Sequence, residues 1–200
     1  MVDPIKFYFD FSSPYAYFAA LKIDGIASSF DREVDWQPIL LGATMKVTGN
    51  SPLAHQPLKS DYVKHDWERL SRFMDVPWTL PETFPIATVA AARAYYWIRD
   101  EDEVVAKKFA AACFGKYFGE GRDITTQEVV ADIAESLGIN RQELLEAIVS
   151  DNVKQRLRDE TQAATDAGVC GVPFFIIDGE PIWGSDRLWM IRRWLKSGGW

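Results

Sequence analysis

Two serines lie near the start of the chain, where a strand pattern gives way to a helix pattern. Ser13 precedes Pro14, and serine followed by proline is typical of the N-cap and first turn of an α-helix. The local sequence alone favours this capping role over catalysis. The two roles are compatible, because the unpaired N–H groups and the positive dipole end of a helix start stabilise an anion. A thiolate at this turn would also accept a hydrogen bond from the Ser13 hydroxyl, whereas Ser12 is expected to pack or to cap.

Polar residues elsewhere are candidates for binding, and each also has a purely structural interpretation. Ser185 and Asp186 are predicted to begin a helix, where they either cap it or bind a carboxylate and an amine. Lys46 and Asn50 lie in a predicted loop, where a lysine is usually solvated and an asparagine usually forms a turn. Pro173 is predicted to begin a strand, which is a common place for proline.

Several other chemistries are disfavoured. Cys113 and Cys170 are far apart and form no C-x-x-C motif, so neither a disulfide framework nor a zinc site is expected. Cys113 is expected to pack within a helix, and Cys170 either lies near a site or is buried as a small hydrophobic residue. His55 and His65 have no partner at metal-ligand spacing, so no metal is predicted. No G-x-G-x-x-G motif, P-loop or Ser–His–Asp ordering is present.

The composition is that of a globular protein without special partners. The 200 residues are 48% hydrophobic and 26% charged, which is enough for a substantial core. The net charge is −7 and no basic run is present, so nucleic acid and anionic membranes are not expected as partners. No signal peptide and no run of about 18 apolar residues is recognised, which predicts a cytoplasmic protein.

The elements that must position these residues form a βαβ unit, a block of helices and a ββα unit. The first unit predicts parallel strands joined by a right-handed crossover, and Gly179 in the last unit predicts a β-hairpin. Capping boxes are predicted at Thr125 with Glu128 and at Asn140 with Glu143. The predicted elements are strand 5–10, helix 14–30, strand 34–41, loop 42–59, helices 60–75, 86–100, 100–121, 125–138, 140–150 and 151–168, strands 172–178 and 180–184, and a capped final helix 185–196.

This order resembles the thioredoxin arrangement with a helical insertion, as in DsbA-like and kappa-class proteins. The fold class is therefore predicted to be α/β. Residues 1–41 plus 160–200 are expected to form the thioredoxin-like domain, and residues 42–159 the helical insertion domain. Four motifs in order make the resemblance more specific: DFSSPYAY, LLGATMKVTGNSP, GVPFF and GSDRL. With them the whole chain resembles the 2-hydroxychromene-2-carboxylate isomerase family, which is related to kappa-class glutathione transferases.

The resemblance implies a glutathione-dependent isomerase that acts on small aromatic or unsaturated carbonyl compounds. Such an enzyme would serve aromatic hydrocarbon catabolism, with glutathione as cofactor and a homodimer as the expected assembly. In dithiol oxidoreductases of this fold a C-x-x-C motif occupies the turn that here runs from Ser13 to Ala16, so disulfide exchange at this turn is excluded. The family's matching serine contacts the glutathione sulfur, which makes Ser13 the predicted catalytic residue.

The same resemblance assigns the other predicted site residues. Glutathione is expected to pair with Val172 beside a cis-Pro173, and its γ-glutamyl end is expected against Trp183, Gly184, Ser185 and Asp186. Lys46 and Asn50 are assigned both to glutathione and to the substrate pocket. The pocket is completed by Tyr15, Phe84 and Pro85.

Two alternatives remain open. The same site could serve a kappa-like glutathione transferase or peroxidase, which differs only in the electrophile. It could also belong to a DsbA-like protein that binds thiols or peptides without turnover. The chain departs from the family pattern at Ala54-His55-Gln56, where naphthalene-pathway isomerases carry Asn-Arg; if that arginine recognises the substrate carboxylate, this protein is expected to prefer another substrate.

Overall fold

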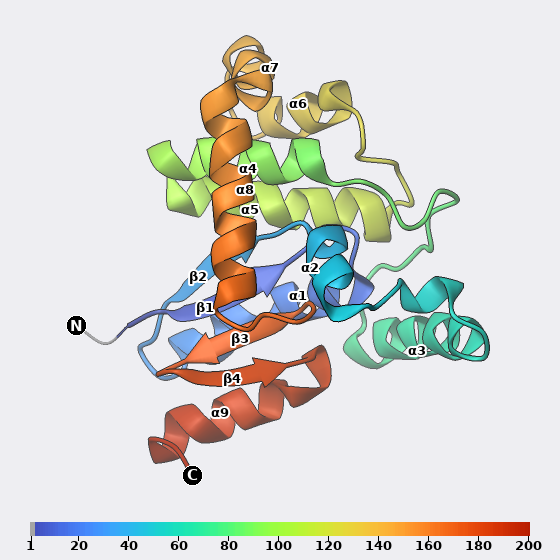
Figure 1. Cartoon of the computed structure of the whole chain (residues 1–200), viewed down its shortest axis with the longest axis vertical. Helices are drawn as coiled ribbons and strands as arrows, with labels where there is room; N and C mark the ends of the chain where they lie inside the picture. Colours follow the sequence, from blue (N-terminus) through green and yellow to red (C-terminus); the bar gives the residue numbers. More distant parts are fainter. Residues whose placement is uncertain (1–2) are drawn as a thin grey trace.

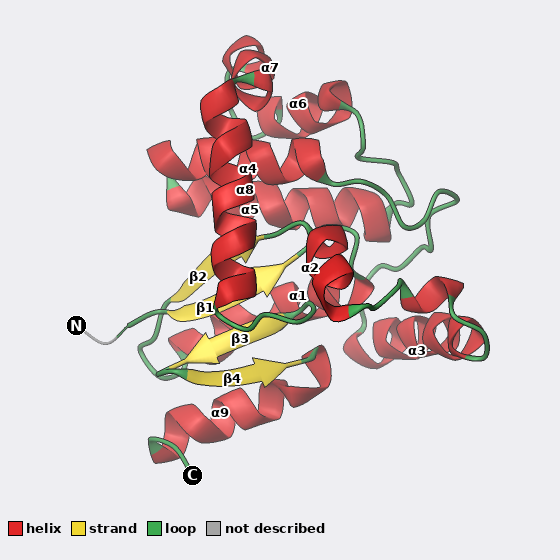
Figure 2. Ribbon diagram, in the orientation of Figure 1, coloured by secondary structure: helices red, strands yellow, loops and turns green. Residues whose placement is uncertain are grey.

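The computed structural model describes residues 3–200, in which the strands form one mixed sheet. The strands are β1 (Ile5–Phe9), β2 (Val34–Pro38), β3 (Phe174–Ile177) and β4 (Glu180–Trp183), arranged in the order β2-β1-β3-β4 (Figure 2). Strand β1 pairs parallel with β2 and antiparallel with β3, and β3 pairs antiparallel with β4. This is the topology expected from a βαβ unit followed by a hairpin, so the predicted thioredoxin-like fold class is confirmed.

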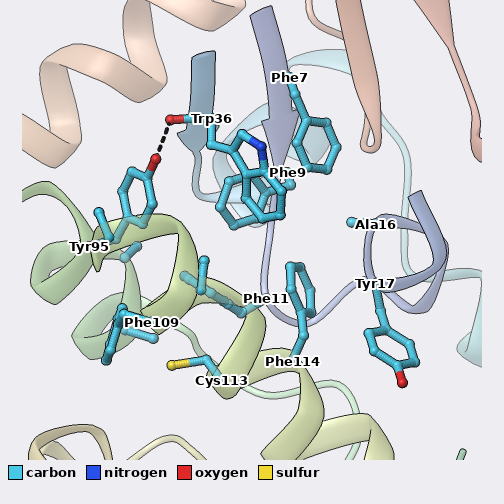
Figure 3. Close-up of a cluster of buried hydrophobic side chains, with 14 of the residues drawn as sticks. Phe7, Phe9, Phe11, Ala16, Tyr17, Trp36, Tyr95, Phe109, Cys113 and Phe114 are labelled. Atoms are coloured by element: carbon cyan, nitrogen blue, oxygen red, sulfur yellow. Dashed lines mark hydrogen bonds between the residues drawn. The ribbon is translucent and has the colours of Figure 1, made fainter. Parts of the chain in front are cut away.

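Alternating residues of β1 face two different layers of helices. Phe7 and Phe9 point into the main core, where Phe7 meets Trp36 edge to face (Figure 3). Phe7 also stacks on Phe175, with ring centroids 5.2 Å apart. Tyr8 points to the opposite face and packs in a second cluster with Ala164. Helices α1 (Pro14–Ser28) and α9 (Leu188–Ser197) cover the first face, and α8 (Asp151–Asp166) crosses the second (Figure 1).

A block of helices lies between β2 and β3 in the sequence, and its members α4 (Val89–Glu101) and α5 (Glu103–Phe114) pack against the β2 edge of the sheet (Figure 1). Three outward carbonyl groups of β2 accept hydrogen bonds from this block: Val34 O from Lys107 Nζ at 2.6 Å, and Trp36 O and Pro38 O from the hydroxyls of Tyr95 and Tyr96, both at 2.9 Å. An open strand edge is thereby covered by side chains rather than by another strand. The helices of the block are α2 (Leu41–Thr48), α3 (Lys59–Met74), α4 (Val89–Glu101), α5 (Glu103–Phe114) with a π-helical turn (Gly115–Gly119), α6 (Gln127–Glu135), α7 (Arg141–Val149) and α8.

The predicted division into two domains stays a prediction. Helix α8 runs without interruption across residue 160, where the boundary was placed. Among the described residues, no helix combines the length and apolarity needed to cross a bilayer.

Three local predictions were wrong. The segment predicted as a loop over 42–59 contains helix α2 and a short 3-10 helix (Leu53–His55). Thr44 is the only fully buried residue of helix α2. Because the helix buries no row of apolar side chains, its sequence lacks the apolar spacing that would have predicted a helix. Thr126 rather than Thr125 caps α6, and its hydroxyl accepts from Val129 N. The final helix was predicted to be capped and to begin at residue 185, but a 3-10 turn (Ser185–Arg187) precedes α9 there. Neither this turn nor α9 has a side-chain cap at its start.

Other local predictions agree with the structure. Asn140 caps α7 and its side-chain amide also donates to Glu143 Oε1 at 3.0 Å. The hairpin between β3 and β4 turns at Asp178 and Gly179, which both have positive φ. Arg32 and Trp194 donate to the Asp178 carboxylate at 2.8 and 2.9 Å, which ties this turn to the rest of the fold.

Candidate active site

A cavity of about 680 Å³ lies beyond the end of β1. Its walls come from the start of α1, from α2 and the segment that follows it, from the connector before α4, and from the turn that leads into β3. Its lining is mostly apolar, with a few polar groups, which is the usual character of a small-molecule site. The main polar side chains in the lining are those of Asp10, Ser12, Ser13, Lys46, Asn50, Ser51, Gln56, Lys59 and Thr88.

Ser13 occupies the N-cap of α1 and lines this cavity. Its Oγ accepts a hydrogen bond from Ala16 N at 3.2 Å, and the residue is 6% exposed. Because the hydroxyl oxygen acts as the acceptor in that bond, its proton remains available for a second partner. Ser12 is held differently, since its N–H and its hydroxyl both donate to Asp10 Oδ1 at 2.8 Å. The capping role predicted for Ser13 is therefore present, and the geometry leaves a donor beside an anion-stabilising helix start.

Most of the predicted site residues meet at this cavity. Eight line it directly: Ser13, Tyr15, Lys46, Asn50, Phe84, Pro85, Val172 and Trp183. Pro173 follows Val172 through a cis peptide bond, and Pro173 O accepts from Gly184 N at 2.9 Å. Gly184, Ser185 and Asp186 are not part of the lining.

The main chain at Val172 is free to pair with an extended ligand. Within residues 3–200 neither the N–H nor the C=O of Val172 forms a hydrogen bond. Trp183 forms the adjoining wall, is 50% exposed, and lies against Gly171, where an added Cβ would be 2.9 Å from the indole ring. Glycine at position 171 therefore allows the aromatic ring to approach the backbone at this wall.

The two residues predicted in the loop are placed differently by helix α2. Lys46 lies in the last turn of α2 rather than in a loop, so its position is fixed by a regular element. Asn50 follows the helix; its N–H donates to Met45 O at 3.1 Å and its side-chain amide donates to Thr48 Oγ1 at 3.0 Å. Asn50 thus also fulfils the turn role that its sequence context indicated.

An aromatic wall from α1, α3 and the connector closes the cavity on one side. The Tyr15 hydroxyl donates to Asp66 Oδ2 at 2.8 Å, so it is not a free donor. Burial raises the pKa of the Tyr15 phenol well above its usual range, and the bond to Asp66 raises it further. Trp67 meets Tyr15 and Phe84 edge to face, with ring centroids 6.2 and 5.4 Å away. Trp67 and Asp66 were not predicted as site residues. The amphipathic pattern of α3 shows that one face of the helix is buried, but it does not show that this face lies beside the cavity.

The two cysteines differ in their access to the cavity. Cys113 is fully buried, and burial raises the pKa of its thiol well above the usual range. Cys170 lines the cavity and is partly exposed. Within the described part of the chain no cluster of His, Cys, Asp and Glu has the arrangement of a metal site. Asp10 also lines the cavity and was not singled out from the sequence, although it directly precedes the two serines.

The sheet order, the helix start at the end of β1 and the cis-proline beside it define a thioredoxin-like protein. The DSBA-like thioredoxin domain matches residues 4–196, so the chain belongs to that family. It is 28% identical to a 2-hydroxychromene-2-carboxylate isomerase from Sphingobium xenophagum, and the alignment covers 98% of this chain and 99% of that protein. It is 27% identical to a glutathione S-transferase kappa 1 from Rattus norvegicus, with 92% of this chain and 87% of that protein covered.

A solved structure extends this similarity to three dimensions. A 2-hydroxychromene-2-carboxylate isomerase superposes with a TM-score of 0.88 at 25% identity, covering 97% of this chain and 95% of that one. The resemblance drawn from the four sequence motifs is therefore confirmed at the level of the family and the fold.

Proposed function

We propose that the protein is a glutathione-dependent isomerase of the 2-hydroxychromene-2-carboxylate type, which acts on small aromatic or unsaturated carbonyl compounds as a homodimer. The observation that carries the proposal is the meeting of two features in one cavity. The Ser13 hydroxyl, with a proton to donate, lies at a helix start. The unpaired main chain of Val172 lies beside the cis-proline and is suited to a peptide ligand. The isomerase and glutathione transferase relatives add support.

The residues present suit glutathione. Its peptide groups can pair with Val172 N–H and C=O in the manner of an added strand. Lys46 on α2 can attract one of its carboxylates, and Trp183 offers a flat apolar wall. Ser185 and Asp186 lie outside the cavity lining, so their predicted role requires the γ-glutamyl end to extend past Trp183 toward the 3-10 turn.

Ser13 would act on the thiol by stabilising its anion. A free thiol titrates near about 8.5, and a hydrogen bond to a charged group contributes about 1.5–3 kcal/mol. Since one pKa unit corresponds to about 1.4 kcal/mol, the hydroxyl alone lowers the pKa of a bound thiol by about 1–2 units. The start of α1 lowers it further. Both effects together produce a substantial thiolate fraction at neutral pH.

Bound glutathione would supply a thiolate that adds reversibly to an unsaturated carbon and leaves again after rotation about a single bond. The chain's own residues provide the surroundings for this exchange. The aromatic wall of Tyr15, Trp67 and Phe84 excludes water and packs against a flat substrate. Lys46 is the donor best placed for negative charge on a substrate oxygen, because Tyr15 is bound to Asp66.

A second candidate function uses the same residues. The kappa-class relative favours a glutathione transferase or peroxidase, in which the thiolate attacks a different electrophile. Turnover of chlorodinitrobenzene without isomerisation of 2-hydroxychromene-2-carboxylate would select this function.

The test has two parts. Calorimetry measures glutathione binding, and thiolate absorbance near 240 nm during a pH titration gives the pKa of the bound thiol. Turnover of 2-hydroxychromene-2-carboxylate is then followed with and without glutathione. We expect micromolar to millimolar binding, a thiol pKa at least 1 unit below about 8.5, and turnover only with glutathione. Equal turnover without glutathione, or a bound thiol no more acidic than the free one, would refute the proposal. Insulin reduction should be absent.

A further inference from the structure

Three helices begin at the wall of the same cavity. Ser13 and Pro14 start α1, residues 40–43 start α2, and Thr88 and Val89 start α4, and all of these line the cavity. Helix starts carry unpaired N–H groups and partial positive charge, so three of them in one place need a partner of negative charge.

The Asp10 side chain lies at this meeting point and is 4% exposed. Its Oδ1 accepts from Ser12 N, Ser12 Oγ and Thr88 Oγ1, each at 2.8 Å, and its Oδ2 accepts from Leu41 N, also at 2.8 Å. One carboxylate at the end of β1 therefore binds the residue before the N-cap of α1, the N-cap residue of α4 and the first residue of α2.

Of the three helices, α2 is the one whose first backbone N–H donates to Asp10; α4 also lacks a side-chain cap, and there Asp10 accepts from the Thr88 hydroxyl instead. The N-cap residue of α2 is Leu40, which offers no side-chain acceptor, and no side-chain cap is formed there. By contrast, α1 is capped by Ser13. Asp10 thus replaces the missing cap of α2 from a position 31 residues earlier in the chain.

We propose that Asp10 is a positioning residue that holds the start of α2 against the start of α1. It thereby fixes the distance between Ser13 on one wall and Lys46 on the other. The proposal rests on the proposed function only where it is tested by catalysis, since it concerns the placement of two walls of one cavity.

The substitution Asp10→Asn tests the bond to α2 separately from the bonds near the start of α1. An asparagine has one acceptor oxygen and one NH₂ group. The Ser12 and Thr88 hydroxyls can accept as well as donate, so the fixed donors are Ser12 N–H on one side and Leu41 N–H on the other. We expect the oxygen to keep the local bond to Ser12 N–H, two residues along the chain, which leaves the NH₂ group facing Leu41 N–H, donor against donor. The α1 side should therefore keep its geometry, and α2 should be released.

Two measurements report this split. At saturating glutathione, D10N should raise the KM for the electrophile about tenfold, because Lys46 and the rest of the α2 wall have moved. The pKa of the bound thiol should not rise, because Ser13 has not moved and the loss of a negative charge in the cavity favours the thiolate. Amides of 41–48 should exchange hydrogen with solvent faster than in the unmodified protein, and those of 14–28 should not. The exchange measurement needs neither glutathione nor activity.

A second variant tests the same contact without placing an amide against a donor. Leu41→Pro removes the N–H at the first helical position, where proline is well tolerated, and Leu40 already has the extended conformation that a following proline requires. L41P should raise the KM in the same direction, and the double variant D10N/L41P should be no worse than D10N. Additive losses would contradict a single shared contact.

Asp102→Asn is the matched control. Asp102 caps α5 by accepting from Val104 N and Val105 N at 2.8 and 3.0 Å, and it does not line the cavity. D102N should leave the KM and the thiol pKa unchanged.

Several outcomes would overturn the proposal. If D10N lowers the melting temperature but changes neither the KM nor the exchange of 41–48, the role of Asp10 is merely structural. If D10N raises the thiol pKa at normal KM, Asp10 acts through the start of α1 instead. Absence of glutathione-dependent turnover in the unmodified protein would refute the proposed function, and the exchange of 41–48 in D10N would still decide the role of Asp10.

Discussion

Replacing Ser13 by alanine removes two contributions that can be measured separately. The first is the cap: the bond from Ala16 N to Ser13 Oγ is 3.2 Å long and lies at a residue that is 6% exposed, so water does not replace it well. Its loss should lower the free energy of unfolding by about 1 kcal/mol. The second is the hydroxyl donor to the thiolate, whose loss should raise the pKa of bound glutathione by about 1–2 units.

The second contribution predicts a characteristic pH profile. At pH 7 a rise of this size lowers the thiolate fraction, and with it the rate, by about tenfold or more. Raising the pH toward 9 should restore much of the rate in S13A, because the thiol then ionises without the serine. The thiol pKa is read from the absorbance near 240 nm, and stability from urea denaturation.

Ser150→Ala is the control for the cap alone. Ser150 caps α8 by accepting from Val153 N at 3.4 Å, and it is not part of the cavity lining. Both variants should lose comparable stability, and only S13A should shift the thiol pKa. The reasoning fails if S13A keeps the thiol pKa of the unmodified protein, or if S150A loses activity to the same extent.

Three further predictions follow from single contacts. In the native protein a thiol reagent should modify Cys170 and spare Cys113, and saturating S-methylglutathione should slow the modification; equal labelling of both would contradict the burial of Cys113. Gly171→Ala should displace Trp183, whose ring would lie 2.9 Å from the new Cβ. Calorimetry should then show weaker glutathione binding at nearly unchanged melting temperature, because the ring is half exposed; unchanged binding would remove Trp183 from the site. For Asp178, the hydrogen bond from Arg32 and, to a smaller extent, the one from Trp194 lower the pKa of the carboxyl group. The Asp178 carboxylate therefore stabilises the folded protein above the pKa of about 3.9 that it has in the unfolded chain, and this stability is lost as the pH falls through its lower pKa in the folded protein. D178N should therefore lose at most about 1 kcal/mol at pH 7, since the side chain is 38% exposed, with no loss near pH 2; a loss that persists there would refute the assignment.

The parts of this fold that could be predicted from sequence are those set by neighbours in the chain. The strand–helix junction at Ser13 and Pro14 has a local cause, namely a cap followed by a proline that suits the first turn. The hairpin at Gly179 follows from a residue that adopts positive φ without strain. The binding role of the GVPFF residues and the catalytic role of Ser13 came instead from the resemblance to the isomerase family, because the local sequence indicated only a strand start and a helix cap.

The parts that could not be predicted depend on partners far away in the chain. Helix α2 lacks an amphipathic period and a local cap, and Asp10 and Thr161 hold its first residues from 31 and 121 positions away. The role of Asp66 likewise depends on Tyr15, which lies 51 residues earlier. Such contacts leave no pattern in the segments that make them.

Under the proposed function, a thioredoxin-like fold uses a sulfur that the start of its own first helix does not carry. A helix start stabilises any anion placed beside it, whether the atom belongs to the chain or to a ligand. Here the turn from Ser13 to Ala16 supplies no thiol and Cys113 is buried, whereas Cys170 lines the cavity from the segment that leads into β3 rather than from the start of α1. The field at α1 is therefore available to a sulfur that enters the cavity with a ligand. The same cavity offers that ligand an unpaired stretch of main chain at Val172, so the proposal draws binding and activation from two walls of one cavity.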